Sequence, residues 1–81
     1  METTNNKIWI ITNYKGEFIK ACATRESALY EMETWRGGFI KSGLFGEVKP
    51  IDKVYCDRIS FQVVYRSGES RTMVARETIL Y

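Results

Sequence analysis

The stretch that decides the fold is residues 24–36, TRESALYEMETWR. At 100° per residue its apolar side chains fall within one narrow arc, formed by Ala28, Met32, Trp35 and, if the helix runs on, Phe39, with Leu29 at the edge. The opposite side carries Glu26, Tyr30 and Glu33. A lone helix of about 12 residues is marginal in water, so this stripe must lie on another element. The flanking segments have the pattern of β-hairpins, and the sequence therefore predicts a helix on a sheet.

The ends of this helix are marked by residues with known end preferences. Thr24 is a good N-cap, and Glu26 in the first turn and Arg36 in the last turn suit the helix dipole. Gly37 and Gly38 follow and are a natural stop. We therefore expect the helix to end near residue 36.

The segment before the helix predicts a hairpin, with strands over residues 7–13 and 17–23 joined by a turn at 13–16. A two-residue loop would set Ile10 opposite Ala21, Ile8 opposite Ala23 and Thr12 opposite Ile19. The two alanines leave room for a helix, so we expect the helix to lie on this face and Trp35 to be largely buried against it. The other face would then be half-exposed, with Trp9, Ile11, Phe18, Lys20 and Cys22.

Residues 37–50 hold four of the six glycines and the only proline of the chain. A loop of this length in a small domain is usually functional or contains a further element. Its apolar residues, Phe39, Ile40, Leu44 and Phe45, are expected to close the core at the sheet edge, and an exposed binding loop is the alternative. The segment does not match a phosphate-binding glycine pattern.

The C-terminal part predicts a second hairpin. Residues 51–57 form a short strand or the approach to one, residues 59–65 alternate strictly, and residues 71–80 return after a turn at Ser67 and Gly68. A three-residue loop would set Val63 opposite Met73 and Phe61 opposite Ala75, and a two-residue loop would set Phe61 opposite Val74. The predicted fold is α+β, a single helix on a mainly antiparallel four- to five-stranded sheet, in the order β-β-α-(β)-β-β.

Size and composition bound the class of protein. The 81 residues predict one small domain over residues 1–81, of which 1–6 are expected to fray. The net charge of +2 is too small to require a nucleic acid or a membrane as partner. No signal peptide and no apolar run long enough for a membrane span is present. Two widely spaced cysteines favour a reducing, cytoplasmic location.

The chain has no histidine. General bases, metal sites and nucleophilic triads use this residue most often. Glu31 and Glu33 do not form a carboxylate pair, because residues two apart on a helix point in different directions. We therefore expect no enzyme activity, no catalytic residue, no metal and no cofactor.

The function that these features favour is a protein-binding or regulatory module, such as a small inhibitor of a larger partner. The element order resembles that of β-grasp proteins, which implies a fold and no function. The small size without motifs is similar to that of accessory proteins from phages and mobile elements. Partner contacts are expected from Trp9, Phe18, Tyr30, Glu26, Glu33, Phe39 and Phe45. The two open edges of the sheet, together with an outer-face patch around Trp9, also predict a homodimer, or a monomer that uses this face for its partner.

The alternative function is nucleic-acid binding by the second hairpin. It carries Arg58, Arg66, Arg71 and Arg76, with tyrosines nearby, and the segment 58–81 sums to +2. Arginine and aromatic side chains on a sheet can hold a nucleic acid by charge and stacking. The same arginines can also simply keep strand edges soluble, and no known RNA-binding motif accompanies them.

Overall fold

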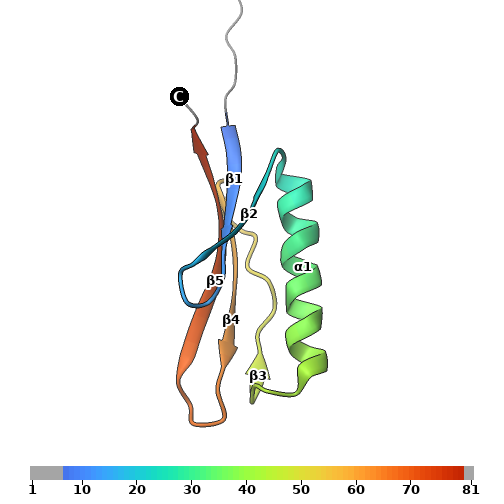
Figure 1. Ribbon diagram of the computed structural model, residues 1–81, viewed down its shortest axis with the longest axis vertical. Coiled ribbons are helices and arrows are strands. Elements are labelled where there is room, and N and C mark those ends of the chain that lie inside the picture. The colour runs from blue at the N-terminus through green and yellow to red at the C-terminus, as the bar shows by residue number, and fades with distance from the viewer. Residues whose placement is uncertain (1–6, 80–81) are drawn as a thin grey trace, which may run out of the picture.

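The computed structural model describes residues 7–79 and confirms the predicted fold, with one helix packed on a five-stranded antiparallel sheet (Figure 1). The elements are β1 (Lys7–Thr12), β2 (Phe18–Cys22), α1 (Arg25–Ser42), β3 (Glu47–Val48), β4 (Arg58–Val64) and β5 (Ser70–Ile79). Their order in the sheet is β2-β1-β5-β4-β3, so the N-terminal hairpin joins the C-terminal one through β1 and β5. The expected fraying of residues 1–6 lies outside the described residues.

Both hairpins use a three-residue loop that ends in glycine. The backbone N–H of Asn13 donates to the carbonyl of Glu17 over 2.9 Å, and that of Tyr65 donates to Glu69 over 2.7 Å. The last loop residues, Gly16 and Gly68, have φ values of 84° and 100°, which favour glycine. The predicted two-residue loop of the first hairpin is therefore wrong.

The loops set the strand registers. Ile10 lies opposite Ala21 as predicted, but the register then shifts and places Thr12 opposite Phe18 instead of Ile19. In the second hairpin Phe61 lies opposite Met73, which neither predicted register gave. The loop begins one residue earlier than expected, so the pairing moves by two residues and the side chains keep their faces.

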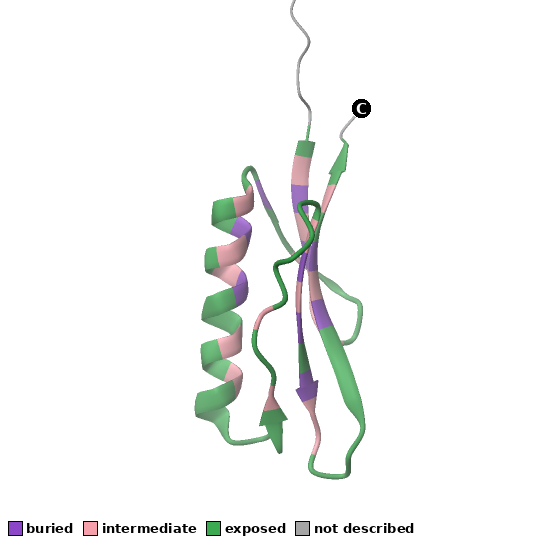
Figure 2. Ribbon diagram, turned by 180° about the vertical axis from the view of Figure 1, so that it is seen from behind, coloured by how far each residue is buried: buried purple, intermediate pink, exposed green. Residues whose placement is uncertain are grey.

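The prediction of which face of β1 meets the helix is wrong. Trp9 and Ile11 are buried, at 2% and 0% exposure, and belong to the core under α1 (Figure 2). Ile11 pairs with Ala75 of β5, which lies on the same face as Phe61. The apolar face of the second hairpin thus determines which side of β1 is buried, and no Trp9 patch is left for a partner or a second copy. The core is Trp9, Ile11, Cys22, Ala28, Met32, Ile59, Phe61, Val63, Met73 and Ala75.

The helix is longer than predicted. Thr24 caps it as expected, accepting a hydrogen bond from the Ser27 N–H over 3.1 Å, but α1 continues through both glycines to Ser42. Gly43 then provides a left-handed C-cap with φ 68°. Each helical glycine costs about 1 kcal/mol relative to alanine, and the packing of Phe39 against Phe61, with ring centroids 6.0 Å apart, offsets that cost.

Segment 43–57 closes one side of the core. Closure of the core was predicted for residues 37–50, which include the first part of the segment. Val48 in β3 and Ile51 pack against the core. Of the four apolar residues expected to close the core, Phe39 and Phe45 also pack against it, whereas Ile40 and Leu44 are 52% and 71% exposed. Two arginines of α1 bind its backbone. Arg36 Nε donates to the Lys49 carbonyl over 2.7 Å, and Arg25 Nη2 donates to the Lys53 carbonyl over 3.0 Å. This leaves the β2 side of the helix as the side that the segment does not cover.

Candidate protein-binding groove

An apolar hollow of about 380 Å³ lies beside the C-terminal half of α1. Its lining residues are Tyr14, Thr34, Trp35, Gly38, Phe39, Ser42, Leu44 and Phe45. The rings of Tyr14, Phe39 and Phe45 pack edge to face at 5.4–5.9 Å between centroids. These contacts fix the aromatic wall, so the hollow is formed before anything enters it. We call it the aromatic hollow.

Two of the three hydroxyl groups in the lining of the aromatic hollow, those of Thr34 and Ser42, are directed to the protein's own backbone, and the third belongs to Tyr14. Thr34 Oγ1 donates to the carbonyl of Tyr30 over 2.9 Å, and Ser42 Oγ donates to that of Phe39 over 2.7 Å. Ser42 Oγ also accepts a hydrogen bond from the Leu44 N–H over 3.3 Å. Because these groups are already paired, the hollow suits an apolar side chain better than a polar one.

Gly38 lines the aromatic hollow, and its neighbour Gly37 does not. A Cβ built at either position would meet no atom within 4 Å. Packing within the chain therefore requires no glycine at either site, although both glycines weaken the helix. At Gly38 the absence of a side chain keeps the helix backbone open to a group that enters the hollow.

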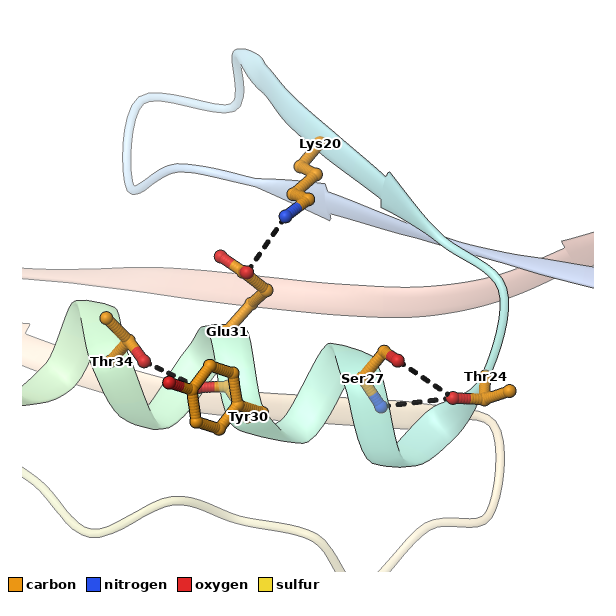
Figure 3. A network of polar contacts seen from close by, with 6 residues as sticks. All are labelled: Lys20, Thr24, Ser27, Tyr30, Glu31 and Thr34. Atoms are coloured by element: carbon orange, nitrogen blue, oxygen red, sulfur yellow. Dashed lines mark hydrogen bonds and ion pairs between the residues drawn. The ribbon is translucent and has the colours of Figure 1, made fainter.

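A second hollow, of about 460 Å³, lies between β2 and the N-terminal half of α1. It is lined by Lys20, Ala21, Cys22, Ala23, Glu26, Ser27, Tyr30 and Glu31. Lys20 Nζ donates to Glu31 Oε2 over 2.9 Å, so strand and helix meet across this hollow (Figure 3). The hydrogen bond and the charge of Glu31 raise the pKa of Lys20 above 10.5. Both hollows border α1, the second one at its N-terminal half and the aromatic hollow at its C-terminal half, and we call the two together the groove.

The structure gathers several of the predicted partner residues in this groove. Phe39 and Phe45 line the aromatic hollow, and Glu26 and Tyr30, which is 69% exposed, line the second one. The other predicted residues lie outside both linings. Glu33 is exposed on α1, Phe18 is 64% exposed on the edge strand β2, and Trp9 is buried.

Sequence reasoning missed Trp35, Gly38, Leu44 and Tyr14 as groove residues. The prediction that Trp35 is largely buried is wrong, because it is 37% exposed at the side of the helix stripe. Gly38 could have been found, since a glycine pair inside a helix that continues calls for an explanation. Tyr14 had no signal, because its position depends on how the hairpin turn meets the helix.

The four arginines of the nucleic-acid alternative do not form one cluster. Arg66 Nη2 donates to the Gly43 carbonyl over 2.6 Å, and Arg71 forms an ion pair with Glu69 at 3.0 Å. Arg58 and Arg76 instead lie directly opposite each other on β4 and β5. The arginine-rich hairpin thus has two separate pairs in different surroundings.

Within residues 7–79, no three His, Cys, Asp or Glu side chains lie close enough together to hold a metal ion. The one helix of that range is not apolar enough to cross a membrane. Comparisons with protein-family models, with curated proteins and with solved structures found no match. The functional argument therefore depends on the geometry of this chain.

Proposed function

We propose that the protein is a non-enzymatic binding module that holds an extended segment of a larger protein along α1, in the hollow between α1 and β2 and in the aromatic hollow. The observation that carries this proposal is the aromatic hollow, which is preformed, apolar and open at Gly38. Exposed Trp35 and Leu44 at its rim are side chains of the kind that anchor protein interfaces. Such a module would regulate the larger partner by binding this segment and keeping it from other contacts.

An extended segment fits better than a helix, because β2 is an edge strand. No described strand pairs with the outer side of β2, so its free backbone groups can accept a further strand. Antiparallel addition is the more frequent geometry in sheets. A segment added in this way would run along the groove from the second hollow to the aromatic hollow.

The charges of the groove suggest a sequence pattern for the segment. Glu26 and Tyr30 line the second hollow and favour a lysine or arginine, whereas the aromatic hollow favours a bulky apolar residue. Tyr30 and Gly38 are about 12 Å apart along the helix. An extended chain covers that distance in about four residues. We therefore expect a basic residue followed, about four positions later, by a leucine, a phenylalanine or a similar residue.

The test uses two leucine variants of adjacent helical glycines. Gly38→Leu fills the aromatic hollow, while Gly37→Leu adds the same side chain at a position that does not line it. Peptides selected from a random library on the parent protein should show the expected pattern. Their affinity, measured by calorimetry, should fall at least about tenfold for Gly38→Leu and stay within about twofold for Gly37→Leu. Equal loss in both variants, or no selected peptide, would contradict the proposal.

The location proposed for this activity is the cytoplasm. Cys22 and Cys56 are both free, and Cys56 is exposed, which suits a reducing compartment. A homodimer remains a prediction that now depends on the open sheet edges at β2 and β3, because Trp9 is buried and forms no patch. Light scattering at micromolar concentration tests it directly.

A further inference from the structure

The face of the sheet opposite α1 is open. In both ribbon views the helix lies on one side of the strands only (Figures 1 and 2). On the three central strands, the side chains that point away from the core include two arginines, Arg58 and Arg76, and no carboxylate. Their polar neighbours on this face are Ser60, Gln62, Thr72 and Thr78. Ile8, Ile10, Val64 and Val74 also point outward, so the face combines one pair of cationic side chains with polar and aliphatic ones.

Arg58 and Arg76 are cross-strand partners. Like charges directly opposite each other destabilise an antiparallel pair unless an anion lies between them. Arg58 stacks on the Tyr55 ring at 4.4 Å from the guanidinium carbon to the centroid, which orients it without neutralising it. Within residues 7–79 neither arginine forms an ion pair. Among the residues that the structure describes, these two adjacent positive charges thus have no ion-pair partner.

The surroundings of this pair extend the positive surface. A shallow hollow of about 600 Å³ includes both arginines, Lys49, Gln62 and Thr72, and Asp52 is the acidic residue in its lining. A smaller hollow brings Asp57 and Glu77 near the arginines from the other side. Glu77 is paired with Lys7 at 3.8 Å. The cationic groups therefore face outward across the strands, and the carboxylates lie at the margins.

We propose that this open face binds the phosphate backbone of a double-stranded nucleic acid, with Arg58 and Arg76 as the central contacts. Arginine, lysine, serine, threonine and glutamine are the side chains that donate to phosphate oxygens. A single strand is the poorer occupant, because the outward side chains of β1, β4 and β5 include no aromatic ring on which bases could stack, and the Tyr55 ring beside them is already stacked on Arg58. The site lies across the sheet from the peptide groove and does not depend on it.

The test compares two arginine pairs of the same hairpin. Anisotropy of a labelled duplex of about 20 base pairs, measured between about 50 and 200 mM salt, should give an affinity that falls steeply with salt. Arg58→Gln with Arg76→Gln should weaken binding at least about tenfold and flatten the salt slope by about 2. The matched control, Arg66→Gln with Arg71→Gln, has the same change of charge and should stay within about threefold. Melting curves would verify that both variants are folded.

Three outcomes would overturn this inference. The first is that the parent protein does not bind the duplex at the lowest salt. The second is that the two double variants lose affinity equally, because an equal loss would indicate attraction by net charge alone. In the third outcome, poly-glutamate or a single-stranded oligonucleotide competes as well as unlabelled duplex. An effective poly-glutamate competitor would assign the face to an acidic protein surface instead.

Discussion

Lys20 on the edge strand β2 donates through Nζ to Oε2 of Glu31 on α1 over 2.9 Å, and this pair joins the two walls of the groove. The pair is exposed, so it contributes little to the stability of the fold. Its position is more informative. A segment that adds to β2 and enters the second hollow must pass this ion pair, because both of its side chains line that hollow.

The first prediction concerns the titration of Lys20. Its pKa is raised above 10.5, first by the hydrogen bond to Glu31 and then by the charge of that carboxylate. The stabilisation from the pair is therefore fully present below pH 10.5 and is lost as pH rises through the raised pKa. Glu31→Gln should bring the pKa of Lys20 down towards its ordinary value, measured by NMR titration. Any difference in melting temperature between parent and variant should be present at neutral pH and disappear above the raised pKa.

The second prediction compares two aromatic residues. Phe61 is 2% exposed at the centre of the core, and Phe61→Ala should cost about 3–5 kcal/mol. Trp35 is 37% exposed at the groove rim, and Trp35→Ala should cost only about 1–2 kcal/mol, because its ring leaves a smaller cavity. Urea unfolding measures both values. If Trp35→Ala is the more damaging change, the rim position assigned to the ring is wrong.

The errors of sequence reasoning have physical causes. Both faces of β1 are apolar, since Ile8 and Ile10 alternate with Trp9 and Ile11, so periodicity alone cannot select the buried face. The pairing of β1 with β5, where Ile11 lies opposite Ala75, determines which face of β1 is buried. This contact joins residues that are distant in the sequence. By contrast, β4 has one apolar face, and the predicted alternation matches its buried residues Ile59, Phe61 and Val63 in spite of the register error.

The groove was predictable only in part for the same reason. Helical spacing correctly separated Tyr30 and Glu26 from the buried Ala28 and Met32. Nothing local, however, indicates that the turn residue Tyr14 packs against Phe39 of the helix. A site that combines distant segments can be recognised in the sequence only where a residue is unfavourable for its local structure. Gly38 is such a residue, because glycine weakens the interior of a helix.

The third prediction separates the roles of two glycines. Gly37 has ordinary helical backbone and open space around it, so Gly37→Ala should stabilise the protein by about 0.5–1 kcal/mol. Gly43 has φ 68°, and Gly43→Ala should destabilise it by about 1–2 kcal/mol, because a Cβ is disfavoured in the left-handed region. Opposite shifts of the denaturation midpoint, with unchanged slope, are the expected result. Two shifts of the same sign would mean that α1 does not end at Gly43.

The fourth prediction concerns the opposed arginines. Arg76→Gln removes a like-charge contact with Arg58, so at low salt it should stabilise the free protein by about 0.2–1 kcal/mol. The gain should shrink as salt screens the pair. Thermal unfolding at two salt concentrations measures this, with Arg71→Gln as control, since that change removes the ion pair with Glu69 and no repulsion. A loss of stability at low salt would show that Arg76 is already neutralised within the chain.

The last prediction uses the two thiols as reporters of the groove. Cys22 is 6% exposed and lies in the lining of the second hollow, whereas Cys56 is exposed on the far side of the helix N-terminus, near the backbone that Arg25 binds. Alkylation followed by mass spectrometry should modify Cys56 quickly and Cys22 slowly, because Cys22 reacts only when β2 opens locally. A bound peptide should slow the reaction of Cys22 further and leave that of Cys56 unchanged. If the peptide protects Cys56 instead, the partner segment lies along residues 49–57 and not along β2.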